Sequence, residues 1–160
     1  MEREPEILIV NMPPCRMATS GVINDEPTFH RFERMWSNIG RRIGDKVNAR
    51  DFMHDDPESG HPIWLFLLDD SMTEAETDGF EIVNFPGGLF AVVHADNWEK
   101  DERARVCDSA KAWVNRQEHL ELDETPVRHI MFHFAGPHSA QMKEWGYAKV
   151  RYFIPIKVKQ

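Results

Sequence analysis

Histidines are the side chains of this sequence best suited to proton transfer, and there are eight of them. His94 and His133 both occur in apolar runs, where an imidazole could serve as a general acid or base in a pocket. The alternative is a histidine whose ring nitrogens are satisfied by ordinary structural hydrogen bonds. If the protein is a hydrolase, His133 is the candidate catalytic residue. No Ser/His/Asp or Cys/His signature indicates covalent catalysis, so neither Ser139 nor Cys107 is assigned as a nucleophile.

The histidines do not form a recognisable metal site. His129 and His133 are four residues apart, or about 13 Å along a strand, which is too far to share a zinc ion with Zn–N bonds of about 2 Å. His54 and His61 flank an acidic segment that we interpret as a solvated turn. Neither an HExxH motif nor paired CxxC motifs occur. We therefore predict no metal and no cofactor.

Aromatic side chains offer a second kind of chemistry, the binding of an apolar molecule. There are five tryptophans, and pockets for small molecules are mostly apolar and aromatic. Trp64 and Phe66 share one face of a predicted strand, and Trp98 follows another strand, where it could cap a pocket. Ring faces would also attract a cation. Core packing is the alternative, especially for Trp36 and Trp113, which lie in helical patterns.

A short repeat organises the elements that carry these residues. Residues 9–13 read Ile-Val-Asn-Met-Pro and residues 82–86 read Ile-Val-Asn-Phe-Pro, at an offset of 73. Each segment breaks at a proline, which cannot donate to a strand ladder, and an apolar run then resumes at residues 15–19 and 89–94. We interpret the two breaks as kinks or bulges, with Gly87-Gly88 supporting the second.

A helical pattern follows each pair of runs. The first has apolar residues at spacings of 3, 4, 3 and 4, with Thr28 as predicted N-cap and Gly44 as predicted stop: Phe29, Phe32, Trp36, Ile39 and Ile43. The second is weaker, covers about residues 101–117 with Asp101 as predicted cap, and has this stripe: Val106, Ala110, Trp113 and Val114.

Further strands are predicted after each helix, at residues 63–68, 128–134 and 152–156, with loops at 54–61, 70–79 and 135–146. The sequence thus predicts a single α+β domain over residues 1–160, formed by two tandem pseudo-symmetric strand-helix-strand-strand repeats, about 5–72 and 78–159.

Composition narrows the function classes. The 160 residues are 41% hydrophobic and 29% charged, as in ordinary globular domains, which argues against disorder. A net charge of −8 disfavours direct nucleic-acid binding. No apolar run approaches the roughly 18 residues of a membrane span, and no secretory signal opens the sequence. With two cysteines far apart, read as small buried apolar residues, a cytoplasmic location is expected.

Several segments together resemble the GyrI-like small-molecule-binding domains, also called bacterial transcription activator effector-binding domains. They are residues 6–13 (Glu-Ile-Leu-Ile-Val-Asn-Met-Pro), residues 85–94 (Phe-Pro-Gly-Gly-Leu-Phe-Ala-Val-Val-His), the helix with Trp113, and residues 152–156 (Tyr-Phe-Ile-Pro-Ile). The resemblance implies two SHS2-like units with antiparallel sheets and a central cleft, in a standalone member. It also implies a lipophilic, often cationic aromatic ligand in a channel between the repeats.

The resemblance fails at one point, because the family usually carries a channel glutamate in a "Glu, any, Tyr" pattern. Here Phe132 and Phe134, or His133 after a shift of one residue, take its place. Two alternatives remain: a hydrolase of electrophilic lipophilic genotoxins, or an acidic interaction protein of the gyrase-inhibitor type, with a possible protein partner and a monomeric or homodimeric state. The predicted ligand contacts are Trp36, Trp64, Phe66, Phe90, His94, Trp98, Phe132, His133 and Tyr152.

Overall fold

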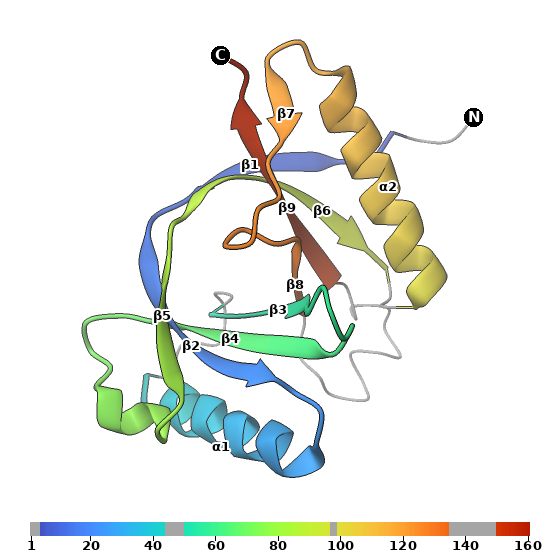
Figure 1. Cartoon of the computed structure of the whole chain (residues 1–160). Helices are drawn as coiled ribbons and strands as arrows, with labels where there is room; N and C mark the ends of the chain where they lie inside the picture. The colour runs from blue at the N-terminus through green and yellow to red at the C-terminus, as the bar shows by residue number, and fades with distance from the viewer. Residues whose placement is uncertain (1–3, 44–49, 97–98, 135–149) are drawn as a thin grey trace. The chain divides into compact units, whose positions relative to one another are not determined.

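The computed structural model describes residues 4–43, 50–96, 99–134 and 150–160, which form two compact units (Figure 1). The first unit combines residues 1–13 with residues 86–160, and the second consists of residues 14–85. Each unit has a sheet and one long helix, and all described strand pairs are antiparallel. This confirms the predicted α+β class.

In the first unit the sheet has the order β1-β6-β9-β8, and β7 pairs with the far end of β9. Its elements are β1 (Ile7–Met12), β6 (Gly88–Ala95), α2 (Lys100–Arg116), β7 (Leu120–Leu122), β8 (Met131–Phe134) and β9 (Val150–Val158). Among the described strands of this unit, only the edge strand β1 comes from the first half of the chain.

The second unit mirrors this arrangement with the order β5-β2-β4-β3. Its elements are β2 (Cys15–Val22), α1 (Glu26–Ile43), β3 (Asp51–Asp55), β4 (Pro62–Leu68), the 3₁₀ helix η1 (Glu74–Thr77) and β5 (Glu81–Phe85). Here the edge strand is β5, which follows the other strands in the chain and carries the second Ile-Val-Asn-aromatic-Pro segment. The first unit therefore takes its edge strand from a remote part of the chain, whereas the described strands of the second unit all come from the continuous segment Pro14–Phe85.

The predicted apolar stripe of the first helix lies on the buried side of α1. Phe32 and Ile39 are buried, and Phe29, Trp36 and Ile43 pack against the same cluster from a half-buried position. The predicted N-cap is wrong by three residues. The side chain of Asp25 accepts hydrogen bonds from the backbone N–H (2.7 Å) and the hydroxyl (3.0 Å) of Thr28, so Asp25 satisfies one of the free N–H groups of the first turn. The predicted stop, Gly44, lies outside the described residues.

The second helix, α2, agrees to within one residue at each end with the predicted range of about 101–117. Val106, Ala110 and Val114 are its buried residues, whereas Trp113 is only half-buried. The helix begins at Lys100 after Glu99 as N-cap, so Asp101 lies within the first turn and the prediction that it caps the helix is wrong. A carboxylate there still favours the positive end of the helix dipole.

The predictions for residues 54–61 and 128–134 need correction, and no strand was placed at β3 or β7. β3 includes His54 and Asp55, the first residues of the predicted loop 54–61. β7 has only three residues and no alternation long enough to detect. β8 begins at Met131, because Arg128 lies in a turn and forms an isolated bridge with Thr125. The predicted loop 70–79 contains η1, and the loop 135–146 lies outside the described residues.

Arg128 connects three segments of the first unit from this turn. Its guanidinium forms an ion pair with Asp123, donates to the carbonyl oxygens of Leu89 (2.5 Å) and Ile156 (3.4 Å), and lies 4.9 Å over the ring of Phe90. Gly88, at φ +110°, makes room for it, since a Cβ there would lie 3.0 Å from an Arg128 nitrogen. The second glycine of the Pro-Gly-Gly segment thus serves both backbone conformation and side-chain packing.

Candidate functional site

A cavity of about 620 Å³ opens in the first unit, between the start of β1 and α2. This volume falls within the range of pockets for small molecules. Leu8, Val93 and Val106 supply apolar surface, while the carboxylates of Glu6 and Asp96 supply negative charge. The cavity thus offers apolar walls for the lipophilic part of an amphiphilic molecule and charged groups for its polar part.

Two ion pairs fix the charged groups around this cavity. Arg105 of α2 donates two hydrogen bonds to the carboxylate of Glu102 (2.9 and 3.0 Å). This hydrogen bonding, together with the positive charge of Arg105, keeps the pKa of Glu102 below its ordinary value. Glu4 pairs with Arg116 at 3.2 Å near the other end of the helix. Because the arginine of each pair is largely exposed, each pair contributes less than about 1 kcal/mol to stability.

A row of basic side chains crosses the sheet of the same unit. In the strand register, Arg151 of β9 lies directly opposite His94 of β6 on one side and His133 of β8 on the other. The Nε–H of Arg151 donates to Nε2 of His94 at 3.0 Å, so that nitrogen is unprotonated and the imidazole carries its proton on Nδ1. His94 is exposed and also borders the cavity, whereas Arg151 and His133 are half-buried.

This basic row lies on the sheet face that α2 does not cover. The guanidinium of Arg103, in α2, lies 5.2 Å over the ring of Phe132, so Phe132 projects toward the helix. In the strand register, Tyr152 lies opposite Phe132 of β8 on one side and Val93 of β6 on the other, so the three side chains share one face. Successive side chains alternate between faces, so His133, Arg151 and His94 project away from α2.

An apolar row borders the basic row on that face. Val92, Phe153 and Met131 lie directly opposite one another on β6, β9 and β8, and all three are buried. The ring of Phe153 packs against Phe90 with centroids 6.3 Å apart. Positive charge therefore stands next to apolar surface, where electrostatic interactions are stronger than in water.

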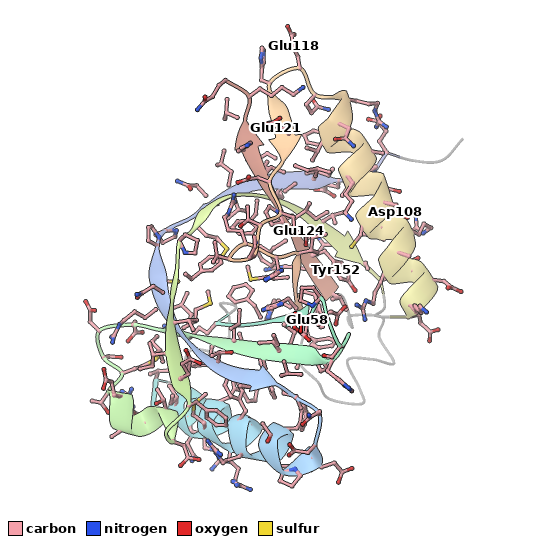
Figure 2. All side chains as sticks on the ribbon, in the orientation of Figure 1. Glu58, Asp108, Glu118, Glu121, Glu124 and Tyr152 are labelled. Carbon is pink, nitrogen blue, oxygen red and sulfur yellow. The ribbon has the colours of Figure 1, made fainter. Side chains whose placement is uncertain are left out.

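The structure separates the other residues predicted to bind ligand in the first unit. Phe90 is fully buried beneath Arg128. Phe132 and Tyr152, the latter labelled on β9 in Figure 2, pack against each other with centroids 6.1 Å apart on the helix face. The described contacts of Phe90, Phe132 and Tyr152 are thus packing contacts, and their role in binding stays a prediction. Trp98 lies outside the described residues.

Trp36, Trp64 and Phe66 belong to the second unit and lie in its core. The Trp64 ring is 5.2 Å from Phe32 and 6.2 Å from Trp36, and its indole N–H donates to the Asp51 carboxylate at 3.0 Å. Phe66 is 1% exposed in the same cluster. The face shared by Trp64 and Phe66 is therefore the one that α1 covers, which agrees with the core-packing alternative, while ligand contact at these positions stays a prediction.

A second cavity of about 500 Å³ lies between α1 and η1. Arg34 and Asn38 of the helix and Glu76 and Asp78 of the 3₁₀ segment border it. The backbone N–H of Thr73 donates to the Glu76 carboxylate, and this hydrogen bond, together with that from Arg42, holds the pKa of Glu76 below its ordinary value. None of its lining residues was predicted from the sequence as a binding residue.

Metal binding has no visible support in these ranges. Within residues 4–43, 50–96, 99–134 and 150–160, no three His, Cys, Asp or Glu side chains gather closely enough to hold an ion. Over the same residues, neither α1 nor α2 combines the length and apolar composition that crossing a bilayer requires.

Cys107 of α2 should react slowly in the native protein. Burial raises the pKa of its thiol to about 11, against an ordinary value near 9, with Lys111 and Arg103 only partly offsetting the shift. At pH 8 the reactive thiolate is then about 100-fold scarcer than in the unfolded chain. We expect iodoacetamide to alkylate Cys107 about 100-fold more slowly in the folded protein than in 8 M urea, measured by mass spectrometry. Rates within threefold of each other would contradict this.

Comparisons with known proteins agree on the fold. No family model matches the sequence, and no curated protein matches it. Among solved structures, a hydrolase from Listeria innocua is similar with a TM-score of 0.67 at 10% identity, covering 98% of this chain and 94% of that one. SAV2435 bound to tetraphenylphosphonium has a TM-score of 0.52 at 6% identity, covering 95% and 94%. The EcmrR C-terminal domain has a TM-score of 0.57 at 10% identity, covering 96% and 98%.

This chain has the fold of those proteins. The match extends over nearly all of it, as the resemblance to GyrI-like domains predicts. At such low identity the likeness concerns the fold alone, and the groups that carry function must be read from this chain's own residues. Arg151 is a candidate group that was not singled out from the sequence. It lies in a predicted strand region opposite two histidines that were singled out, but the sequence does not give this pairing.

Proposed function

We propose that this protein binds a lipophilic aromatic small molecule and does not depend on a metal or cofactor to do so. The observation that carries the proposal is the fold shared with a protein bound to tetraphenylphosphonium, over 95% of this chain. The cavity of about 620 Å³, with apolar walls and charged borders, gives additional support. Binding would draw on burial of apolar ligand surface, at about 25 cal/mol per Å² before the costs of association.

A fluorescence titration tests this proposal. We expect N-phenyl-1-naphthylamine, a neutral lipophilic dye, to bind the native protein with a saturable increase in emission and one site per chain. Lysozyme at equal concentration serves as a control for nonspecific dye uptake. A linear, unsaturable response, or none, would count against a binding protein.

We further propose that the chain consists of two copies of one unit. The order β1-β6-β9-β8 in one sheet corresponds to β5-β2-β4-β3 in the other, with the repeated segments at β1 and β5. The unit boundaries, at Pro13/Pro14 and Phe85/Pro86, coincide with the prolines that end those segments. Both correspondences support a duplication.

A hydrolase is the second candidate, favoured by the similar fold of a hydrolase from Listeria innocua. In this proposal His133 acts as general base or acid, and it lies directly opposite Arg151 of β9 in the strand register. Hydrolysis of an electrophilic lipophilic substrate would then vanish in His133→Ala while near-ultraviolet circular dichroism stays unchanged. Turnover that survives this substitution would remove His133 from the proposal. Whether the acidic protein has a protein partner, as a gyrase inhibitor would, stays a prediction.

A further inference from the structure

We propose that the cavity of about 500 Å³ between α1 and η1 binds a small zwitterion, a molecule with a carboxylate at one end and an ammonium group at the other. Arg34 and Asn38 receive the carboxylate, and Asp78 and Glu76 receive the ammonium group. The volume is in the range of pockets for small molecules. The site lies within the second unit, and the inference does not rest on the function proposed above.

Arg34 brings an unpaired positive charge to the α1 side of this cavity. On a helix, an arginine meets the residues three and four positions away, and around Arg34 these are His30, Arg31, Ser37 and Asn38, none of them an acid. Within residues 4–43, 50–96, 99–134 and 150–160, its guanidinium takes part in no ion pair and no hydrogen bond. All five of its N–H donors are therefore available to a ligand.

Asn38 adds a second donor one helical turn away. Side chains four positions apart lie on the same face of a helix, and both Arg34 and Asn38 are exposed and border the cavity. A guanidinium matches the planar geometry of a carboxylate with two parallel N–H groups, and the amide of Asn38 can donate to the same group. Met35 and Ile39 line the cavity from the buried side of α1, so this side of a bound carboxylate is shielded from water.

The η1 side of the cavity is negative and already held in place. Glu76 accepts hydrogen bonds from the backbone N–H of Thr73 (2.7 Å) and from Arg42 (3.1 Å), and both lower its pKa and keep it ionised at neutral pH. Asp78 pairs with Arg31 at 3.2 Å through one carboxylate oxygen. A carboxylate has about four acceptor sites, so both groups can still accept hydrogen bonds from an ammonium group.

The two sides together select a ligand that carries both charges. A simple anion would gain from Arg34 but meet the carboxylates of Glu76 and Asp78, and a simple cation would meet the reverse. A zwitterion satisfies both sides, and the net charge of −8 neither attracts nor repels it at long range. Because Arg34, Asn38 and Asp78 are exposed, we expect dissociation constants on the order of millimolar.

Ligands of one skeleton and different charge test the proposal by ¹H–¹⁵N NMR titration. One set comprises 6-aminohexanoate, hexanoate and hexylammonium, and a shorter set comprises 4-aminobutyrate, butyrate and butylammonium. We expect the zwitterion of at least one set to shift amide signals of residues 34–38 and 74–78 saturably. It should bind at least fivefold more tightly than either singly charged ligand of its set.

Two substitutions remove one charge each. Arg34→Gln should lower the affinity for the zwitterion at least fivefold and abolish the preference over the ammonium ligand. Asp78→Asn should lower it at least threefold. Asparagine tolerates the left-handed conformation of this position, at φ 53°, and keeps the carbonyl oxygen that accepts from Arg31 (3.3 Å).

Arg41→Gln and Asp70→Asn are the matched controls. Arg41 lies two turns after Arg34 on the same face of α1, about 10 Å further along, and is exposed but does not line the cavity. Asp70 is an exposed acid that does not line it either. These substitutions change net charge equally and should leave the affinity within twofold. Near-ultraviolet circular dichroism verifies the fold of all four variants.

The outcomes separate this site from the function proposed above. Absence of a preference for the zwitterion in both sets overturns the site, as does an affinity unchanged in Arg34→Gln. Equal losses in Arg34→Gln and Arg41→Gln also overturn it, because net charge would then explain the effect. Binding of N-phenyl-1-naphthylamine should be the same in Arg34→Gln as in the native protein, so either proposal can fail without the other.

Discussion

Arg128→Met is expected to lower the free energy of unfolding by about 3 kcal/mol or more. The substitution removes the ion-pair partner of Asp123 and leaves the Leu89 and Ile156 carbonyl oxygens without their donor. Arg128 is only 9% exposed, so water replaces these contacts poorly. Methionine keeps much of the side-chain volume, which limits the loss to polar interactions. Urea denaturation followed by far-ultraviolet circular dichroism measures the change.

Arg105→Met supplies the comparison for Arg128. Arg105 also forms an ion pair with a carboxylate, Glu102, but its side chain is 64% exposed. Exposed pairs contribute less than about 1 kcal/mol, so this variant should unfold close to the native midpoint. Similar losses in the two variants would show that burial does not set the difference and would contradict the role assigned to Arg128.

Phe32→Ala is expected to cost about 3–5 kcal/mol, the range for truncating a buried phenylalanine. Phe32 is completely buried, and its ring contacts Trp64 at 5.2 Å and Phe80 at 5.0 Å between centroids. The cavity left by truncation would border Trp64, so tryptophan emission should shift to longer wavelength as water or mobility reaches the indole. Urea denaturation monitored at that emission gives both quantities.

His30→Ala on the same helix is the control for Phe32. Its side chain is 58% exposed, pairs with the exposed Glu33 at 3.4 Å and meets the ring of Phe29 edge-on with centroids 5.6 Å apart. Alanine favours helix slightly more than histidine, so stability should change by less than about 0.5 kcal/mol. A loss below 1 kcal/mol in Phe32→Ala would mean that this aromatic cluster does not hold α1 on its sheet.

The parts of the fold that the sequence predicted are those with local periodicity. The stripe of α1 repeats over five positions, so it identified the helix and its buried face. The N-cap was harder because Asp25 and Thr28 are both good capping residues. Pro27, which favours the first turn of a helix, was the signal for the earlier start. β7 was not predicted because three residues are too few to show alternation.

The candidate site depended on information that periodicity does not contain. Alternation in β9 places Arg151 on one face, but its neighbours depend on the register with β6 and β8, strands remote in sequence. His94 and His133 were each predicted as pocket residues without any reason to join them. Arg128 was predicted only as part of a strand. Its buried partners, the carbonyl groups of Leu89 and Ile156, likewise come from distant segments, so local sequence did not indicate them.

The origin of the two edge strands has a consequence for how the protein folds. Ile7 of β1 pairs with Val93, 86 positions later, and Cys15 of β2 pairs with Phe85, 70 positions later, so both edge pairings join residues remote in sequence. Such pairings give a high contact order, and the loop-closure entropy must be lost before the contacts form. The strands of the second unit all lie within the continuous segment Pro14–Phe85, whereas the first unit combines β1 with strands that come after residue 86. We therefore expect the second unit to fold first during synthesis and the first unit to complete its sheet only after β9 has been made.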